Sequence, residues 1–166
     1  METGYDLRFD HGDETPERLR LQFSRLVGMT AAQTRHVAGE ALAAVGAGKD
    51  DFVVLAALAE LGPASQAALS GRTRIYTSDL VSVLNGLAGR GWIRRAPDPA
   101  DKRRNVITIT GDGERRLAEL DRVLAGVNDQ IMAPLGRGER QQLFALLGRV
   151  NAHLADVQLA DGPGQA

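Results

Sequence analysis

The sequence predicts a mainly α-helical protein with one small β-hairpin, and three observations support this fold class. Apolar residues recur at helical spacing on both sides of the middle of the chain. The helical spacing of the apolar residues gives way only in two short runs, WIRRA (92–96) and NVITIT (105–110), which are typical of strands. The 166 residues, 43% of them hydrophobic, are enough for one domain or two small lobes that share a core.

The first third of the chain predicts two helices. Thr15 and Pro16 are typical of a helix start, because threonine caps the first turn and proline lacks an N–H that would be unpaired there. Helical spacing then predicts one helix of about 30 residues with a candidate bend at Gly28. After the glycines of segment 46–48, a shorter helix is expected from about residue 50 to the Gly-Pro pair at 62–63.

The middle of the chain predicts a helix-turn-helix followed by a hairpin with a charged tip. Ser65 is placed to cap a very short helix, and Thr77 to cap a second one. The second helix has an apolar face formed by Leu80, Val81, Leu84 and Leu87. Two short helices joined by a turn fit a helix-turn-helix. In the hairpin that follows, two prolines at 97 and 99 keep the connecting loop out of regular pairing.

Residues 110–113 return the chain to helix, and two apolar seams follow. Residues 117, 120, 124, 127 and 131 alternate in spacing between three and four, as in a heptad seam, and a final helix repeats this pattern from 143 to 157. Such seams often form intramolecular cores. Here the extended layout favours packing against a second copy of the chain, together with the first helix. The predicted dimer contacts are Leu19, Phe23, Leu120, Leu124, Val127, Ile131, Leu147, Val150 and Leu154.

The charges are strongly sorted along the chain. Between positions 72 and 104 there are eight basic and three acidic residues, a net charge of +5, whereas the whole chain carries −1. Such an asymmetry predicts that one region binds a polyanion. The alternative is that these arginines are spread over a solvated surface.

Composition also excludes several classes of protein. Without cysteine there is no disulfide, thiol redox or Cys-based zinc chemistry, and His11, His36 and His153 are too far apart to suggest a metal site. No glycine-rich phosphate loop or histidine–carboxylate motif suggests an enzyme or a cofactor, although a serine nucleophile assembled from distant parts stays open. The N-terminus is acidic and polar, unlike a signal peptide, and no apolar stretch predicts a membrane span, so a cytoplasmic protein is expected.

Two segments carry a resemblance to a known family. The run DPADKRRNVITITGDG contains Asp101-x-Arg103, a strand with Ile107 and Ile109, and Thr110-x-x-Gly113 opening a helix, and LNGLAGRGWIRR precedes it. In this order they resemble the wing and recognition-helix end of the MarR family of winged-helix transcriptional regulators, over residues 17–158. Trp92 departs from the pattern, in which an aliphatic residue is usual. It either fills core space or lines a ligand pocket.

The resemblance implies a winged helix-turn-helix flanked by N- and C-terminal dimerisation helices. The expected parts are a flexible acidic N-terminus (1–15), a helical dimerisation region (16–46 and 112–158), a winged helix-turn-helix (47–111) and a disordered tail (159–166). The implied function is that of a homodimeric repressor that binds double-stranded DNA at an inverted-repeat operator. The alternative is a winged-helix adaptor that binds proteins rather than DNA, against which the basic wing argues.

The expected DNA contacts come from two elements. A recognition helix at about 77–89 would enter the major groove, and a wing at about 97–105 would enter the minor groove, whose negative potential attracts arginine. Asp79 accepts from a cytosine amine, orients an arginine, or only stabilises the helix N-terminus. In the wing, Arg103 would enter the groove, Lys102 and Arg104 would bind phosphates, and Asp101 would orient the arginine. The recognition-helix candidates are Arg74, Tyr76, Thr77, Ser78, Asp79 and Ser82.

Members of this family often respond to small aromatic acids or drugs. By resemblance, a ligand between the dimer helices and the DNA-binding lobe would contact Gln33, His36, Phe52 and Arg74. Each of these residues also has a plain structural alternative. The peroxide-sensing branch of the family depends on cysteine, which this chain lacks.

Overall fold

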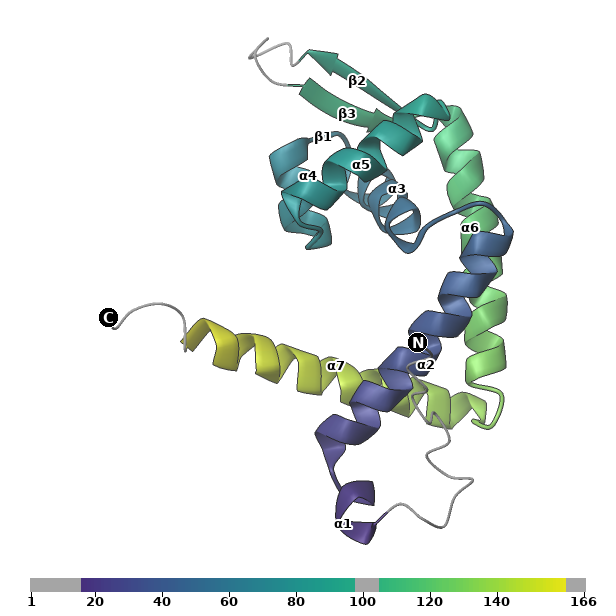
Figure 1. Ribbon diagram of the computed structural model, residues 1–166, viewed down its shortest axis with the longest axis vertical. Helices are drawn as coiled ribbons and strands as arrows, with labels where there is room; N and C mark the ends of the chain where they lie inside the picture. Colours follow the sequence, from purple (N-terminus) through teal and green to yellow (C-terminus); the bar gives the residue numbers. More distant parts are fainter. Residues whose placement is uncertain (1–15, 98–104, 161–166) are drawn as a thin grey trace, which may run out of the picture. The chain divides into compact units, whose positions relative to one another are not determined.

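The computed structural model describes residues 16–97 and 105–160, whose regular structure consists of helices and one small sheet (Figure 1). The chain divides into two compact units, residues 1–127 and 128–166. The second unit contains α7 (Arg137–Ala160) and the last residues of α6 (Gly111–Ile131). The first unit contains the rest of α6 and, before it, α1 (Glu17–Arg20), α2 (Phe23–Ala44), α3 (Lys49–Leu61), α4 (Gln66–Thr73) and α5 (Thr77–Gly89).

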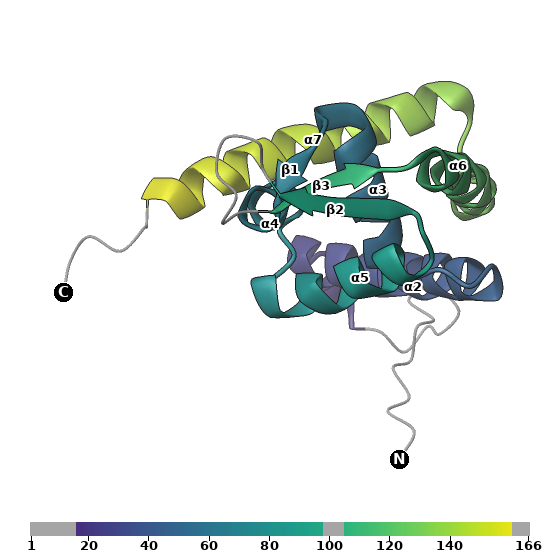
Figure 2. The same cartoon turned by 90° about the horizontal axis from the view of Figure 1, so that it is seen from above.

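The sheet has three antiparallel strands in the order β1-β3-β2. The predicted hairpin is confirmed as β2 (Ile93–Pro97) and β3 (Asn105–Ile109), which run side by side in Figure 2. Strand β1 (Ala64–Ser65) pairs with β3 and was not predicted, because two residues are too short to show a periodicity. The prediction that Pro97 stays out of regular strand pairing is wrong. Pro97 is the last residue of β2 and pairs with Asn105, because an edge strand tolerates the missing N–H of proline.

The hydrophobic core of the first unit joins the helix-turn-helix to the sheet and to α6. Its buried side chains come from α2, the α2–α3 connection, α3, α4, α5, the three strands and α6, and each is at most 8% exposed. Burial of several leucines at roughly 2 kcal/mol each supplies the main drive for this arrangement. The members with the least exposure are Val54, Leu55, Leu58, Leu69, Leu80, Leu84, Leu87, Ile107 and Leu120.

The first helix differs from the prediction. The helical segment is interrupted at residues 21–22, between α1 and α2, because Gln22 has an extended backbone with φ −82° and ψ 105°. Gly28, the candidate bend, lies inside α2. Thr15, the predicted cap, lies outside the described residues. None of the helices within the described ranges combines the length and hydropathy needed to cross a bilayer.

The start of α6 explains the Thr-x-x-Gly motif. The Thr110 hydroxyl donates to the carbonyl of Gly91 (2.7 Å) and accepts from the N–H of Gly113 (3.1 Å), so it caps α6 and ties it to the turn before β2. The Thr110 N–H donates to the carbonyl of Trp92 at 3.0 Å. Gly113 is buried so close to this carbonyl that a Cβ at position 113 would overlap it.

We expect Gly113→Ala to lower the free energy of unfolding by about 1–3 kcal/mol, because the added methyl has to displace the Trp92 backbone. Gly86→Ala in α5 is the control: nothing lies within 4 Å of its added Cβ, and alanine favours helix by about 1 kcal/mol. Urea denaturation of the two variants without DNA measures both effects. Equal stability of the two variants would contradict this account of position 113.

Candidate nucleic-acid interface

Side-chain hydrogen bonds fix the turn between α4 and α5. Ser65 caps α4 as predicted, its hydroxyl accepting from the N–H of Ala68 at 3.3 Å. At the other end of α4, the Ser70 hydroxyl donates to the carbonyl of Ile75 at 2.7 Å, and Ile75 packs against the core. The Thr73 hydroxyl donates to the carbonyl of Leu69 at 2.7 Å. The turn therefore holds the start of α5 in one position relative to α4.

Arg74 in this turn has an unusual backbone. Its φ of 57° and ψ of 23° are left-handed, and it is the one residue other than glycine with a positive φ in the described parts of the chain. This conformation costs a non-glycine residue about 1 kcal/mol. The Arg74 side chain is exposed and makes no hydrogen bond or ion pair to a described residue. Backbone strain at an exposed arginine that pairs with no described residue makes Arg74 a candidate contact for a ligand.

Helix α5 begins one residue earlier than its predicted cap requires. The prediction that Thr77 is the N-cap is wrong: Tyr76 is the N-cap, and its carbonyl accepts from the N–H groups of Asp79 (3.0 Å) and Leu80 (2.9 Å). The reason is that the extended backbone ends at Tyr76, so Thr77 is already helical. The Tyr76 side chain is 80% exposed. The Thr77 hydroxyl lies 3.5 Å from that of Ser70.

One face of α5 is anchored in the core and the opposite face is open. Leu80, Leu84 and Leu87 have no exposed surface. The predicted contacts Thr77, Ser78, Asp79 and Ser82 are all exposed. The structure adds Asn85, which the sequence analysis did not single out, and it corrects Val81, which is 41% exposed rather than part of the apolar face. Spacing from the leucines could have identified both, since each follows a buried leucine by one residue.

The hairpin contributes two further exposed cations. Arg94 and Arg95 lie on β2 opposite Thr108 and Ile107, and neither makes a side-chain ion pair to a residue within the described ranges. The predicted wing contacts Asp101, Lys102, Arg103 and Arg104 lie outside the described residues.

Two of the basic residues counted in the sequence have contacts inside the protomer. Arg72 donates through Nη1 to the carbonyls of Leu61 (3.3 Å) and Gly62 (3.2 Å) at the end of α3. Arg90, which follows α5, pairs with Asp51 at 3.1 Å. Part of the positive charge therefore stabilises the fold.

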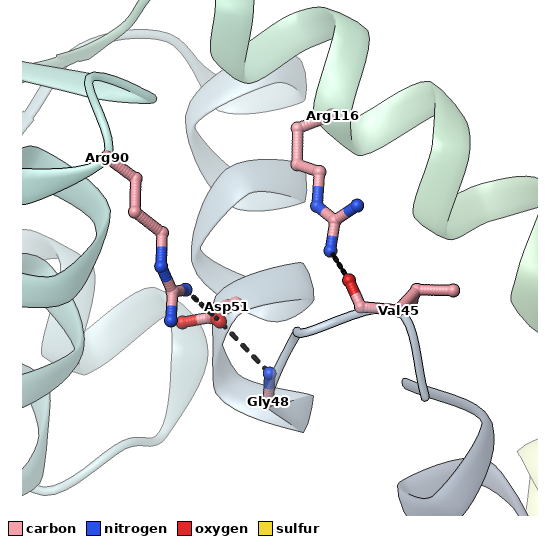
Figure 3. Close-up of polar contacts among 5 residues, drawn as sticks. All are labelled: Val45, Gly48, Asp51, Arg90 and Arg116. Atoms are coloured by element: carbon pink, nitrogen blue, oxygen red, sulfur yellow. Dashed lines mark hydrogen bonds and ion pairs between the residues drawn. The ribbon is translucent and has the colours of Figure 1, made fainter. Parts of the chain in front are cut away.

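The Asp51 carboxylate joins three segments (Figure 3). Its Oδ2 accepts from Nη1 of Arg90 at 3.1 Å and from the N–H of Gly48 at 3.0 Å. Asp51 is only 9% exposed, so its carboxylate is largely shielded from water, whereas the Arg90 side chain is 47% exposed. Together they tie the C-terminal end of α5 to the first turn of α3 and to the connection between α2 and α3. We call this set of contacts the Asp51 clamp.

Trp92 extends the clamp by packing between two arginines. The guanidinium carbons of Arg90 and Arg116 each lie 5.0 Å from the centre of the indole ring, which is cation–π distance. Arg116, on α6, also donates to the carbonyl of Val45 and pairs with Glu119 at 3.0 Å. Trp92 packs against the core, so the structure supports its space-filling role at the point where α5, β2 and α6 meet.

The four predicted effector residues come from three parts of the first unit. Gln33 and His36 lie on α2, where His36 is 3.5 Å from Glu40, Phe52 packs against the core from α3, and Arg74 lies in the turn. A hollow of about 360 Å³ lies between the start of α4 and the hairpin, and none of the four residues lines it. No group of three metal-ligating side chains occurs among the described residues. An effector site at these four residues stays a prediction.

The predicted dimer contacts fall into two groups. Leu19 (40%), Phe23 (56%), Leu147 (38%) and Leu154 (49%) are exposed, while Ile131 and Val150 are half-buried. The group on α6 differs from the prediction. Leu120 has no exposed surface and Leu124 packs against the same core, so both belong to the core of this chain; Val127 is buried as well.

We expect Asp51→Ala to lower the free energy of unfolding by about 2 kcal/mol, because the helix cap and the pair with Arg90 are both lost. The matched control is Asp50→Ala, whose carboxylate pairs, among the described residues, with the exposed Lys49 alone, and it should cost less than about 1 kcal/mol. Thermal and urea unfolding of the two variants measure the difference. Equal losses would refute the importance of the clamp.

Comparison with known proteins identifies the family. Residues 50–104 match the sequence profile of the MarR family. Over 101 residues the chain is 34% identical to the transcriptional regulator HosA of Escherichia coli O111:H-, a match that covers 61% of this chain and 74% of HosA. Over 99 residues it is 29% identical to the transcriptional repressor NicR of Pseudomonas putida, covering 60% of this chain and 63% of NicR.

Solved structures show the same fold. The repressor CouR bound to a 23-mer DNA duplex superposes with a TM-score of 0.76 at 22% identity, covering 84% of this chain and 99% of CouR. BpsR of Bordetella bronchiseptica superposes with a TM-score of 0.71 at 23% identity, covering 82% of this chain and 98% of BpsR. With the winged-helix fold and the identity to HosA, the chain belongs to the MarR family of transcriptional regulators.

Proposed function

We propose that this protein is a sequence-specific repressor that binds an inverted-repeat DNA operator as a homodimer. The single observation that carries the proposal is the geometry of α5. Three buried leucines hold one face of this helix in the core, the opposite face is exposed and mostly polar, and the exposed Arg74 lies in the turn before the helix. A helix of this size fits the major groove, where side chains reach base edges.

The wing completes the proposed interface. Arg94 and Arg95 are exposed on β2, and the sequence continues into Asp101, Lys102, Arg103 and Arg104. In the proposal, segment 97–105 enters the minor groove, with Arg103 attracted by its negative potential and its neighbours on phosphates. The overall charge of −1 is no obstacle, because only the surface that faces the groove has to be basic.

Exposed apolar surface supports the homodimer. No side chain of α7 within its described part is buried, and six large apolar residues on it are exposed. A helix with this much unpaired apolar surface requires a partner in water. In the proposal, segments 16–46 and 112–158 form the dimerisation region and 47–111 the DNA-binding domain. The exposed apolar residues of α7 are Leu143, Phe144, Leu146, Leu147, Leu154 and Val157.

The proposal includes release from DNA by a small aromatic effector. BpsR, one of the structural neighbours, was solved in a study of how 6-hydroxynicotinic acid regulates its DNA binding, and NicR is a repressor. For this chain the proposed effector contacts are Gln33, His36, Phe52 and Arg74.

The proposed function is tested by fluorescence anisotropy with duplex fragments, including the DNA upstream of the protein's own gene, over a range of salt concentrations. We expect tight binding to one palindromic fragment, with a slope of log K against log salt of about −7 for roughly eight phosphate contacts. Arg74→Gly should weaken this binding at least about tenfold. The same change should raise the free energy of unfolding by about 1 kcal/mol, because glycine adopts the left-handed backbone freely.

A variant that gains stability and loses affinity separates a functional contact from damage to the fold. Unchanged affinity in Arg74→Gly would refute the role of Arg74. Weak binding to every fragment, with little dependence on salt, would refute the operator-binding function and favour the protein-binding adaptor.

For the dimer, we expect the double variant Leu147→Asp, Leu154→Asp to be monomeric or aggregated, because two charges would enter an apolar interface. Gln141→Asp is the control, since it adds a charge to an exposed polar position of the same helix. Light scattering coupled to size-exclusion chromatography measures the molar mass. A normal dimer in the double variant would show that α7 is not the interface.

A further inference from the structure

We infer that α5 reads A·T base pairs, with Val81 in contact with a thymine methyl group and Asn85 bonded to adenine. The inference rests on the proposed DNA-binding function and specifies which bases the helix recognises. It is carried by four exposed side chains, which we call the reading patch. The reading patch consists of Ser78, Val81, Ser82 and Asn85.

The spacing of the reading patch places its members side by side. Ser78 and Ser82 are four residues apart, as are Val81 and Asn85, and Ser82 and Asn85 are three apart. Residues at these spacings are neighbours on a helix surface. All four are exposed, whereas the leucines on the opposite face of α5 have no exposed surface. The patch is therefore the part of α5 that a DNA duplex would meet.

The chemistry of α5 disfavours guanine. Guanine is commonly read by a bidentate arginine or lysine on its O6 and N7 atoms. The sequence of α5, TSDLVSVLNGLAG, contains neither residue. Of the two described arginines that flank α5, Arg90 is paired with Asp51, and Arg74 lies in the turn before the helix and can reach only the edge of the contacted segment. The base pairs that face the centre of α5 must be recognised by hydroxyl, amide and apolar groups.

Val81 supplies the apolar group. It is 41% exposed and is not among the residues that pack against the core, in contrast to Val83 two positions further on. A β-branched residue also favours helix less than alanine does, so neither packing nor helix propensity explains a valine at this position. In the major groove the one apolar feature of a base pair is the C5-methyl group of thymine.

Asn85 supplies the complementary polar group. Its amide is exposed and makes no hydrogen bond to a residue within the described ranges, so its donor and acceptor are both available. An asparagine amide pairs bidentately with N6 and N7 of adenine. Four residues rise about 6 Å along a helix, and successive base pairs are about 3.4 Å apart. The thymine and the adenine should therefore lie within two base-pair steps of each other.

Asp79 is the one side chain of α5 whose chemistry favours a G·C pair, through the cytosine amine. It lies in the first turn, where a carboxylate stabilises the helix N-terminus, and it accepts from the hydroxyl of Ser78 at 3.4 Å. We assign Asp79 to this local role. Asp79→Asn should therefore leave the base preferences of Val81 and Asn85 unchanged.

The test selects binding sites for the full-length protein from a library of random-sequence duplexes. We expect a palindromic consensus with T·A and A·T pairs at the centre of each half-site. Replacing the contacted thymine with uracil removes only the methyl group and should lower affinity about fivefold, and 7-deazaadenine at the contacted adenine should lower it about tenfold.

The variants assign each effect to a residue. Val81→Ala should bind thymine and uracil duplexes equally, and Asn85→Ala should lose the response to 7-deazaadenine. Val53→Ala is the matched control, because Val53 is an exposed valine (37%) on α3, and it should behave as the unmodified protein does. A consensus whose central positions are G·C, or one that neither variant alters, would overturn the inference and leave the proposed function intact. Failure to enrich any consensus would count against the proposed function itself and against this inference with it.

Discussion

The rest of the interface depends on the Asp51 carboxylate, which is almost fully buried and accepts from Arg90 and from the N–H of Gly48. A buried carboxylate is stable only when its oxygens are hydrogen-bonded, so the two donors and the acceptor fix one another. Because Arg90 directly follows α5, the pair sets where the C-terminal end of that helix lies. Trp92, between Arg90 and Arg116, extends the same constraint to α6. These contacts fix the end of α5 furthest from Arg74, and the hydrogen-bonded turn after α4 fixes its start.

The two ends of α5 differ in whether their polar side chains are paired within the chain. At the C-terminal end the polar groups are satisfied within the protomer and stabilise the fold. At the N-terminal end Arg74 has a left-handed backbone, and its charge finds no partner among the described residues. Natural proteins lie only a little above the stability they need, so strain of about 1 kcal/mol is retained where it serves a purpose. A rigid end and a strained, open end together suit a helix that has to present its side chains to a ligand.

The charge asymmetry seen in the sequence has two physical origins. Arg72 and Arg90 belong to the protomer, since one binds the carbonyls at the end of α3 and the other pairs with Asp51. Arg74, Arg94 and Arg95 are exposed, and within segment 72–97 they make no side-chain ion pair to a described residue. Counting charges along the chain cannot separate these groups, because the partners of Arg72 and Arg90 lie 10 to 39 residues away in sequence.

The sequence alone determined the features that depend on local spacing. It predicted the helix-turn-helix, the hairpin, the cap at Ser65 and the long C-terminal helix, because periodicity and turn chemistry act over a few residues. The tertiary structure decided whatever depends on distant segments: the two-residue strand β1, the burial of Leu120, the exposure of Val81 and the Asp51 clamp. Leu120 and Leu147 follow the same heptad pattern, yet one is buried in its own core and the other is exposed. A periodic pattern shows that a face is apolar, and only the folded chain decides what covers that face.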